Sequence, residues 1–183
     1  MIIIWKALVE YLGNNLRAGR SVNIKRFGSF TFDIATELPR IATKAVSMTQ
    51  TNNFDLEEQR LDRKHVHNVR PCFVVDSFLQ PHLIHYPGKE EILPAKSQNS
   101  IYQKGFRMIY CNAVPIAAAC LLGKEVVTDA LNTIFLAIVD LIKYNKDLNL
   151  NFGFARISII NRGLKVSFAN DYKSTCVDKT FEN

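Results

Sequence analysis

The stretch that decides the fold is Val22-Asn23-Ile24-Lys25-Arg26-Phe27-Gly28-Ser29-Phe30-Thr31-Phe32. Apolar and polar side chains alternate along it, the alternation breaks at Gly28, and it then resumes. Alternation at every second residue is typical of a half-buried strand, and glycine at the break permits a positive φ or a close backbone approach. The pattern therefore predicts two strands folded back on each other through Arg26-Phe27-Gly28.

The segment before this hairpin predicts a helix that covers it. A two-stranded hairpin alone is only marginally stable in water, so its apolar face needs a neighbour. From Ile4 to about Arg17, apolar residues recur at spacings of three and four, which is the pattern of an amphipathic helix. Gly19 follows as a stop signal. The first unit is therefore a helix, a short loop and a hairpin.

The rest of the first half predicts a third strand after a long insertion. Residues 33–69 are polar and of mixed charge. Val69 to Val75 then form a strand pattern in which Arg70-Pro71 begins the strand at an edge, where the missing N–H of proline does little harm. Asp76-Ser77 is a candidate cap for a short helix that ends near Ile84. The turn residues that follow, up to Leu93-Pro94, predict a domain boundary there.

The second half repeats this order with a much shorter insertion. Asn112 caps a predicted helix that ends at Gly123, and a long helix follows over Val126–Ile142. Its apolar residues lie on more than one side, which predicts burial against two neighbours. Leu148 to Phe154 alternate as a strand, and Asn161-Arg162-Gly163 joins two further strands in a tight hairpin.

These patterns resemble a known fold. A helix, a basic turn and Phe27-Gly28-Ser29-Phe30 resemble the centre of the bacterial HU/IHF histone-like fold. More closely, Trp5 together with residues 22–32 is similar to the eukaryotic HU-like domains of coiled-coil-domain-containing protein 81. The run Arg70-Pro71-Cys72-Phe73-Val74-Val75 resembles the third strand of that family's first domain, and Gly153, Ile157 and residues 165–168 resemble its second domain.

The resemblance implies an α+β protein with two tandem HU/IHF-like domains, each with helices packed on a small antiparallel three-stranded sheet. Residues 1–93 would form the first domain, with an arm-like insertion over 33–69, and residues 94–183 the second, with a short hairpin in place of the arm. The residues that carry the fold signature are Trp5, Phe27, Gly28, Phe30, Pro71, Phe73, Gly153 and Phe168. The HU fold's first helix has no counterpart before the long helix, so it is either missing or supplied by residues outside this sequence. Ile2, Ile3 and Ile4 would then need cover from the second half or from a partner.

The arm-like insertion over residues 33–69 distinguishes between two kinds of partner, DNA and protein. In the HU/IHF fold, the interval between the second and third strands is a β-arm that wraps DNA through basic side chains and a proline wedge. The candidate partner-contacting residues are Arg60, Arg63, Lys64 and Arg70. Asp55, Glu57, Glu58 and Asp62 lie among them and would be placed against phosphate, and no Arg-Asn-Pro-like tip is present. The sequence therefore disfavours DNA wrapping and favours a protein-contacting arm or a solvated loop, with an HU-like architectural DNA-binding protein as the alternative.

Composition limits the remaining possibilities. The formal net charge of +6 permits an acidic partner, either nucleic acid or an acidic protein surface, and the 48% hydrophobic content permits a packed core. Four cysteines without a Cys-x-x-Cys pair fit a reducing compartment. No apolar run approaches the ~18 residues of a membrane span. These features predict a soluble intracellular protein.

Neither catalysis nor metal binding is predicted. His65 and His67, and His82 and His85, have spacings that could ligate zinc if the pairs were brought together. No carboxylate or cysteine accompanies them at a ligand spacing, so surface histidines are the favoured interpretation. The sequence contains no Gly-x-Ser-x-Gly turn, no P-loop and no dinucleotide-binding glycine pattern after a strand. We expect no enzyme activity, cofactor or metal.

The family resemblance implies a structural or scaffolding protein of the cytoskeleton. Expected locations are the cytoplasm and cytoskeleton, at the ciliary axoneme or at the centrosome and basal body. Expected partners are tubulin or other axonemal or centrosomal proteins, with neither nucleic acid nor membrane. HU-like domains ordinarily pair, so the two halves are expected either to pair within one chain or to dock a partner through the same surfaces.

Overall fold

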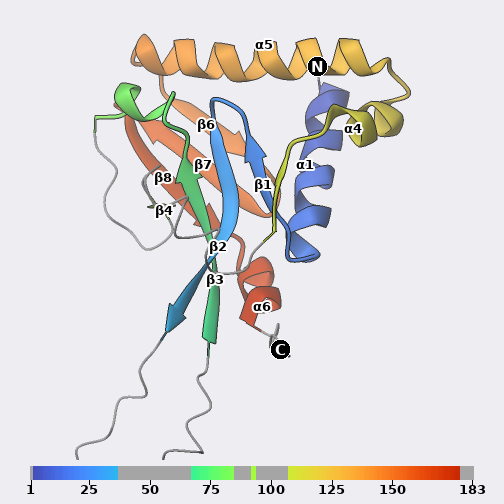
Figure 1. Ribbon diagram of the computed structural model, residues 1–183. Coiled ribbons are helices and arrows are strands. Elements are labelled where there is room, and N and C mark those ends of the chain that lie inside the picture. Colours follow the sequence, from blue (N-terminus) through green and yellow to red (C-terminus); the bar gives the residue numbers. More distant parts are fainter. Residues whose placement is uncertain (1, 37–66, 85–91, 94–106, 178–183) are drawn as a thin grey trace, which may run out of the picture.

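The computed structural model of the 183-residue chain describes residues 2–36, 67–84, 92–93 and 107–177 (Figure 1). The first half contains α1 (Ile2–Arg17), β1 (Ser21–Ile24), β2 (Gly28–Thr36), β3 (His67–Val75), the 3-10 helix η1 (Gln80–His82) and β4 (Ile92–Leu93). The second half contains β5 (Met108–Tyr110), α4 (Ala113–Cys120), α5 (Lys124–Lys143), β6 (Leu148–Asn151), β7 (Ala155–Ile160), β8 (Gly163–Phe168) and α6 (Asn170–Val177). The predicted α+β fold class is confirmed.

The first sheet is wider than the sequence predicts. Its strand order is β4-β3-β2-β1-β5, with antiparallel pairing among the three predicted strands β1, β2 and β3. Two short parallel strands extend it, β4 beside β3 and β5 beside β1. Because β5 comes from the second half and pairs Ile109 with Val22, the two halves are joined by backbone hydrogen bonding as well as by side chains.

The turn between β1 and β2 explains why Gly28 is a glycine. A Cβ atom there would lie 2.4 Å from Cζ of Phe73 and 2.6 Å from the carbonyl oxygen of Val74. Real Cβ atoms do not approach other atoms so closely, so the glycine permits the contact between β2 and β3. The left-handed conformation in this turn belongs to Arg26, whose φ is 68°. Gly28 itself has φ of 159°, which L side chains rarely adopt, so both reasons that the sequence offered for this glycine apply.

Helix α1 follows its predicted pattern. Its buried apolar side chains are Ile4, Ala7, Leu8, Leu12 and Leu16. The helix begins two residues earlier than predicted, and the predicted stop at Gly19 is confirmed, with φ of 72°. The amide of Arg20 donates to the carbonyl of Asn15 (2.9 Å), which is a Schellman-type ending. Of the three isoleucines that were expected to need cover, Ile4 is buried in the core, whereas Ile2 and Ile3 remain 75% and 65% exposed.

Strand β3 corrects one prediction. It begins at His67, so Pro71 lies inside the strand opposite Phe32, not at its start. β4 pairs with β3 only at Phe73 and Val74, so no strand among the described residues flanks Pro71 on that side. The missing N–H therefore costs no ladder hydrogen bond there. After β3, Asp76 Oδ1 accepts a hydrogen bond from Phe78 N (2.8 Å), but the segment continues as a 3-10 helix and not as an α-helix.

The two predicted helices of the second half are both present. Asn112 caps α4, its Oδ1 accepting from Val114 N (3.0 Å). Helix α5 buries one face, formed by Val127, Leu131, Phe135, Ile138, Val139 and Ile142. The predicted burial against two neighbours is met on this one face, although Val126, Leu136 and Leu141 outside it are exposed. The helix contacts α1, α4, β6 and the η1 segment with the single face that it buries.

The second sheet has the order β6-β7-β8 and is antiparallel. The strand predicted from Leu148 to Phe154 is too long. β6 ends at Asn151, and residues 152–154 form the turn to β7, closed by Phe152 N donating to Ala155 O (2.8 Å). The predicted hairpin at Asn161 and Arg162 is confirmed, and both residues have positive φ (50° and 60°), as a tight type I′ turn requires.

A single core runs through both halves, where the turn after β1 meets the turn after β6. The rings of Phe27 and Phe152 are 6.1 Å apart, and those of Phe30 and Phe154 are 5.1 Å apart. The ring of Trp5 on α1 packs at a tilt against that of Phe152, with centroids 5.0 Å apart, and Trp5 Nε1 donates to the carbonyl of Asn151 (3.2 Å). Buried residues from both halves belong to one continuous cluster.

The segments after the third strand of each half cross to the other half. Ile84 N donates to Arg162 O (3.2 Å) in the β7–β8 turn, and η1 contacts α5. In return, α6 packs against β3, as Figure 1 shows at the base of the two long strands. Each half therefore packs a segment that follows its third strand against the other half.

Candidate partner-binding surfaces

The outer face of the first sheet, which points away from the shared core, is largely buried. Ser21, Ser29 and Thr31 are each at most 1% exposed, although all three are polar. Their hydroxyls are satisfied locally, because Ser21 Oγ lies 2.7 Å from Thr31 Oγ1 and Asn23 Nδ2 donates to Ser29 Oγ (2.8 Å). Cys72 and Val74 on β3 are buried on the same side. This part of the first sheet offers no side chains to a partner.

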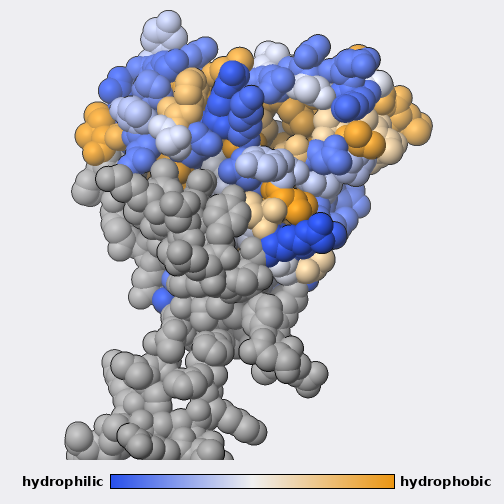
Figure 2. Space-filling view, viewed as in Figure 1, coloured by the Kyte–Doolittle hydropathy of each residue, from blue (hydrophilic) through white to orange (hydrophobic). Residues whose placement is uncertain are grey.

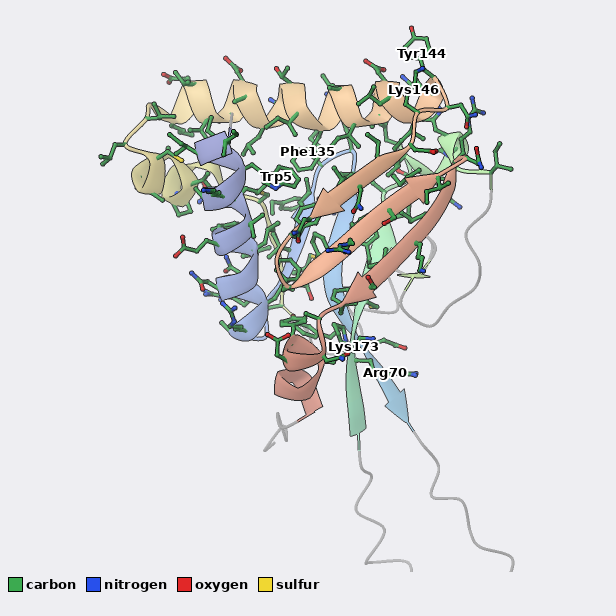
Figure 3. All side chains as sticks on the ribbon, turned by 180° about the vertical axis from the view of Figure 1, so that it is seen from behind. Trp5, Arg70, Phe135, Tyr144, Lys146 and Lys173 are labelled. Carbon is green, nitrogen blue, oxygen red and sulfur yellow. The ribbon has the colours of Figure 1, made fainter. Side chains whose placement is uncertain are left out.

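The outer face of the second sheet is open to solvent, and it turns toward the viewer in Figure 3. We call it the second-sheet face, and its outward residues are Asn149, Asn151, Arg156, Ser158, Ile160, Lys165 and Ser167. Cross-strand pairing places Arg156 opposite Ser167, and Ser158 opposite Lys165. The only charged side chains on the three strands are Arg156 and Lys165. An arginine, a lysine and several hydrogen-bonding side chains without a carboxylate make a surface suited to anionic groups.

The predicted arm begins as a two-stranded ribbon that leaves the body of the molecule (Figure 1). The ladder continues to the pair of Thr36 and His67 and includes Arg70 opposite Asp33. Arg70 is half-buried at the base of this ribbon, near α6, which carries Lys173 (Figure 3). Both signs of charge occur here, so the base of the ribbon alone does not favour an anionic partner. The other predicted contact residues, Arg60, Arg63 and Lys64, lie outside the described residues.

The residues of the fold signature are structural. Phe27, Phe30 and Phe73 pack on one another with centroid separations of 5.0 to 5.4 Å. Phe168 reaches Phe30 from the second sheet at 6.5 Å. Gly153 has φ of 71° in the turn after β6, which is a backbone conformation that favours glycine. The signature therefore marks the shared core and its turns, and it does not mark a binding site.

A cavity of about 210 Å³ lies between β1, β5 and the middle of α5. Side chains of Lys25, Tyr110, Cys111, Asn132 and Phe135 line it. Burial raises the pKa of Cys111 to about 11, so its thiol is protonated at neutral pH and is a poor nucleophile. Burial also raises the pKa of Tyr11, whose hydroxyl accepts from Asn112 N (3.4 Å) nearby. Neither group has the lowered pKa of an activated nucleophile.

The two histidines within the described residues, His67 and His82, are not brought together. His67 begins β3, whereas His82 lies on η1 with its ring 6.4 Å from that of Phe78. His65 and His85 lie outside the described residues. Across residues 2–36, 67–84, 92–93 and 107–177, no group of three or more metal-ligating side chains is present. In the same ranges, no helix combines the length and the apolarity that a bilayer crossing demands.

Sequence reasoning did not single out the second-sheet face. The signal was present, since the polar positions of the alternation in residues 149–167 contain no carboxylate. The same kind of alternation in the first half, however, places Ser29 and Thr31 in a buried environment. Apolar and polar alternation assigns side chains to the two faces of a strand. It does not predict whether the polar outer face of a given sheet is exposed to solvent.

Comparison with protein-family models gives two matches in tandem. The model for CCDC81 eukaryotic HU domain 1 matches residues 1–85, and the model for CCDC81 eukaryotic HU domain 2 matches residues 107–179. Among curated proteins, none matches the chain. The two matched ranges contain nearly all of the described helices and strands.

Proposed function

This chain belongs to the CCDC81 eukaryotic HU-domain family, with both domains in tandem, and from this premise we propose that it is a non-catalytic structural protein of the cytoskeleton. Its role is to hold protein partners together through surface contacts. We place those contacts on microtubules of the ciliary axoneme, or of the centrosome and basal body. HU domains are not known as an enzyme family, which agrees with a scaffolding role.

The unequal outer faces of the two sheets are the observation that carries the proposal. Wrapping of a DNA duplex by the HU/IHF fold depends on basic arms and wedge residues that enter the minor groove. Here the outer face of the first sheet is buried around Ser29 and Thr31, and Asn161 and Arg162 form a tight turn where a second arm would start. A partner that meets one exposed face suits this arrangement better than a wrapped duplex.

The charge of the second-sheet face supports an acidic partner. Arg156 and Lys165 project from neighbouring strands without a carboxylate on the same three strands. Opposite charges across an interface speed association and fix orientation. An acidic protein surface such as that of tubulin would complement this face. A duplex would do so as well, so DNA binding remains the alternative that experiment has to separate.

Fractionation of ciliated cells that carry a tagged copy tests the proposal. Cilia are isolated, membranes are removed with detergent, and axonemes are extracted with high salt. We expect the tag to stay with the salt-washed axoneme or with centrosomes. Recovery in the nucleus, released by moderate salt, would instead support the DNA-binding alternative, because phosphate contacts weaken steeply with salt.

A paired variant tests the second-sheet face within the same assay. Replacing Arg156 and Lys165 by glutamate reverses both charges of the face, and we expect at least a tenfold loss of retention in the axonemal fraction. The control replaces Lys6 and Lys124 by glutamate, since both are exposed and belong to helices and not to the strands of this sheet. Equal losses in the two variants would assign the effect to net charge and remove the face from the interface.

A further inference from the structure

One corner of the molecule is assembled from both halves. Three segments meet there, namely residues 76–84 after β3, the connection from α5 to β6, and the β7–β8 turn. Ile84 N donates to Arg162 O (3.2 Å), and Arg162 Nη2 donates to Lys143 O (2.8 Å). These bonds tie the first half to two segments of the second. Figure 3 shows Tyr144 and Lys146 projecting at this end of α5.

Large apolar side chains are exposed at this corner. Phe78 and Ile84 come from the first half, and Tyr144 and Ile160 come from the second. Ile84 and Tyr144 are 72% and 77% exposed. Figure 2 shows hydrophobic surface beside hydrophilic surface at this end of the molecule. Exposed apolar groups that gather in one place, with aromatic residues among them, are characteristic of protein-binding surfaces.

Cations surround these apolar groups. The guanidinium of Arg26 lies 5.8 Å from the ring centre of Phe78, and Lys143 Nζ lies 6.0 Å from the same ring. The two cations approach Phe78 from different halves of the chain. Lys146 is exposed two residues beyond Tyr144 and forms no ion pair with the part of the chain that the structure describes. The corner is thus both apolar and cationic.

The neighbouring carboxylates are already engaged in local bonds. Asp140 pairs with Lys143 (3.2 Å), Asp147 Oδ1 accepts from Asn161 N (3.0 Å), and Asp76 Oδ1 accepts from Phe78 N (2.8 Å). Each keeps its formal negative charge, but four cations, namely Arg26, Lys143, Lys146 and Arg162, stand against these three carboxylates at the corner. Positive charge is therefore left for an external anion, chiefly at Arg26 and Lys146.

We propose that this corner binds an acidic segment of a protein partner, with an aliphatic or aromatic anchor residue packed against Phe78 and Tyr144. This inference rests on the proposed function and adds a second contact surface and the chemistry of its ligand. Carboxylates of the segment meet Arg26 and Lys146, while the anchor is buried between them. Central apolar anchors with a charged rim are the usual arrangement of an interface.

Fluorescence anisotropy with the full chain tests the proposal. The probe is a labelled peptide of four Glu-Glu-Leu repeats, and the comparison peptide has serine in place of leucine. We expect the leucine peptide to bind at least fivefold more tightly. Lys146→Glu should weaken its binding about tenfold, and Tyr144→Ser about fivefold, because each removes one kind of contact. Lys124→Glu, at the opposite end of α5, is the matched charge control and should change the Kd less than twofold.

Three outcomes would overturn the proposal, namely no binding of the leucine peptide, equal binding of both peptides, or equal losses in Lys146→Glu and Lys124→Glu. The last two would show non-specific attraction to a basic protein. If the peptide fails to bind but the tagged chain remains on salt-washed axonemes, the corner is excluded and the proposed function stands.

Discussion

Gly28 lies where a single methyl group would separate two strands. The space beside its Cα is occupied by the ring of Phe73 and the carbonyl of Val74, and the carbonyl belongs to the sheet backbone and has little freedom to move. At Gly153, the equivalent methyl group would meet Val9 Cγ1 at 3.6 Å, which is ordinary contact. Gly28 thus combines close approach with a positive φ, whereas Gly153 requires glycine for its positive φ alone.

Substitution of these two glycines separates the contribution of close approach to the free energy of unfolding from that of positive φ. Gly28→Ala should lower the free energy of unfolding by about 3 kcal/mol, because overpacking forces β2 and β3 apart. Gly153→Ala should cost about 1 kcal/mol, from the left-handed backbone alone. Urea denaturation of both variants measures the difference. Equal losses would show that the contact with Phe73 and Val74 relaxes freely.

Cys111 gives the protein a predictable response to alkaline pH. Burial raises the pKa of its thiol from 9.0 to about 11, so the folded state holds this proton more tightly than the unfolded state does. The contribution to stability is complete below about pH 9 and is lost as the pH rises through 11, by an amount on the order of 2 kcal/mol. Denaturant unfolding between pH 8 and 11 measures the decline.

Cys111→Ala is the control for that measurement, since lysines and tyrosines titrate in the same window and are present in both proteins. The pKa of Tyr11 is raised by burial too, so its loss of a proton lowers stability in the same direction in the variant and in the parent. The variant should therefore lose stability less steeply above pH 9. Parallel curves for the two proteins would mean that the thiol does not contribute.

At the scale of single elements, local sequence patterns predicted most helix and strand boundaries. They failed where a contact between residues far apart in sequence sets the boundary. Helix α1 and the β7–β8 hairpin follow from residue spacing and turn chemistry, because their information is local. Phe152 and Phe154 read as strand positions, but both point into the shared core from a turn. Their position depends on Phe30 of the other half, which no local window contains. Short α6 carries too few residues for a periodic signal.

The arm is the element whose predicted contacts lie outside the described residues, so it is tested by function. Replacing Arg60, Arg63 and Lys64 by glutamine should weaken axonemal retention several-fold if these side chains meet an acidic partner. A second triple variant at Lys6, Arg107 and Lys124, all exposed on the body, has the same loss of charge. Unchanged retention in the arm variant would remove this cluster from the interface.

At the scale of the whole molecule, the family match accounts for the order of elements, whereas the shared core comes from the pairing of the halves. The sequence left open a choice between pairing within the chain and docking a partner. The described contacts place Trp5, Phe27 and Phe30 against residues of the second half. The parallel strand β5 and the exchanged terminal segments could not be predicted, because both arise from residues that are far apart in sequence.

Trp5 offers a direct test of this pairing in solution, since it is the single tryptophan of the chain and contacts the second half through Phe152 and Asn151. If the halves unfold as one unit, the change in Trp5 fluorescence and the loss of far-ultraviolet circular dichroism should have the same midpoint in urea. The midpoint should not depend on protein concentration. A fluorescence change that precedes the loss of secondary structure would mean that the halves separate before they unfold.

Two similar halves in one chain are free of a constraint that applies to dimers of identical subunits. In a symmetric dimer each mutation occurs on both copies, so a change that suits one copy is also imposed on the other. Here the first half keeps Ser29 and Thr31 in a closed environment, while the second half keeps Arg156 and Lys165 in solvent. Selection acts on each half separately, so one is free to specialise in architecture and the other in recognition without losing their mutual fit.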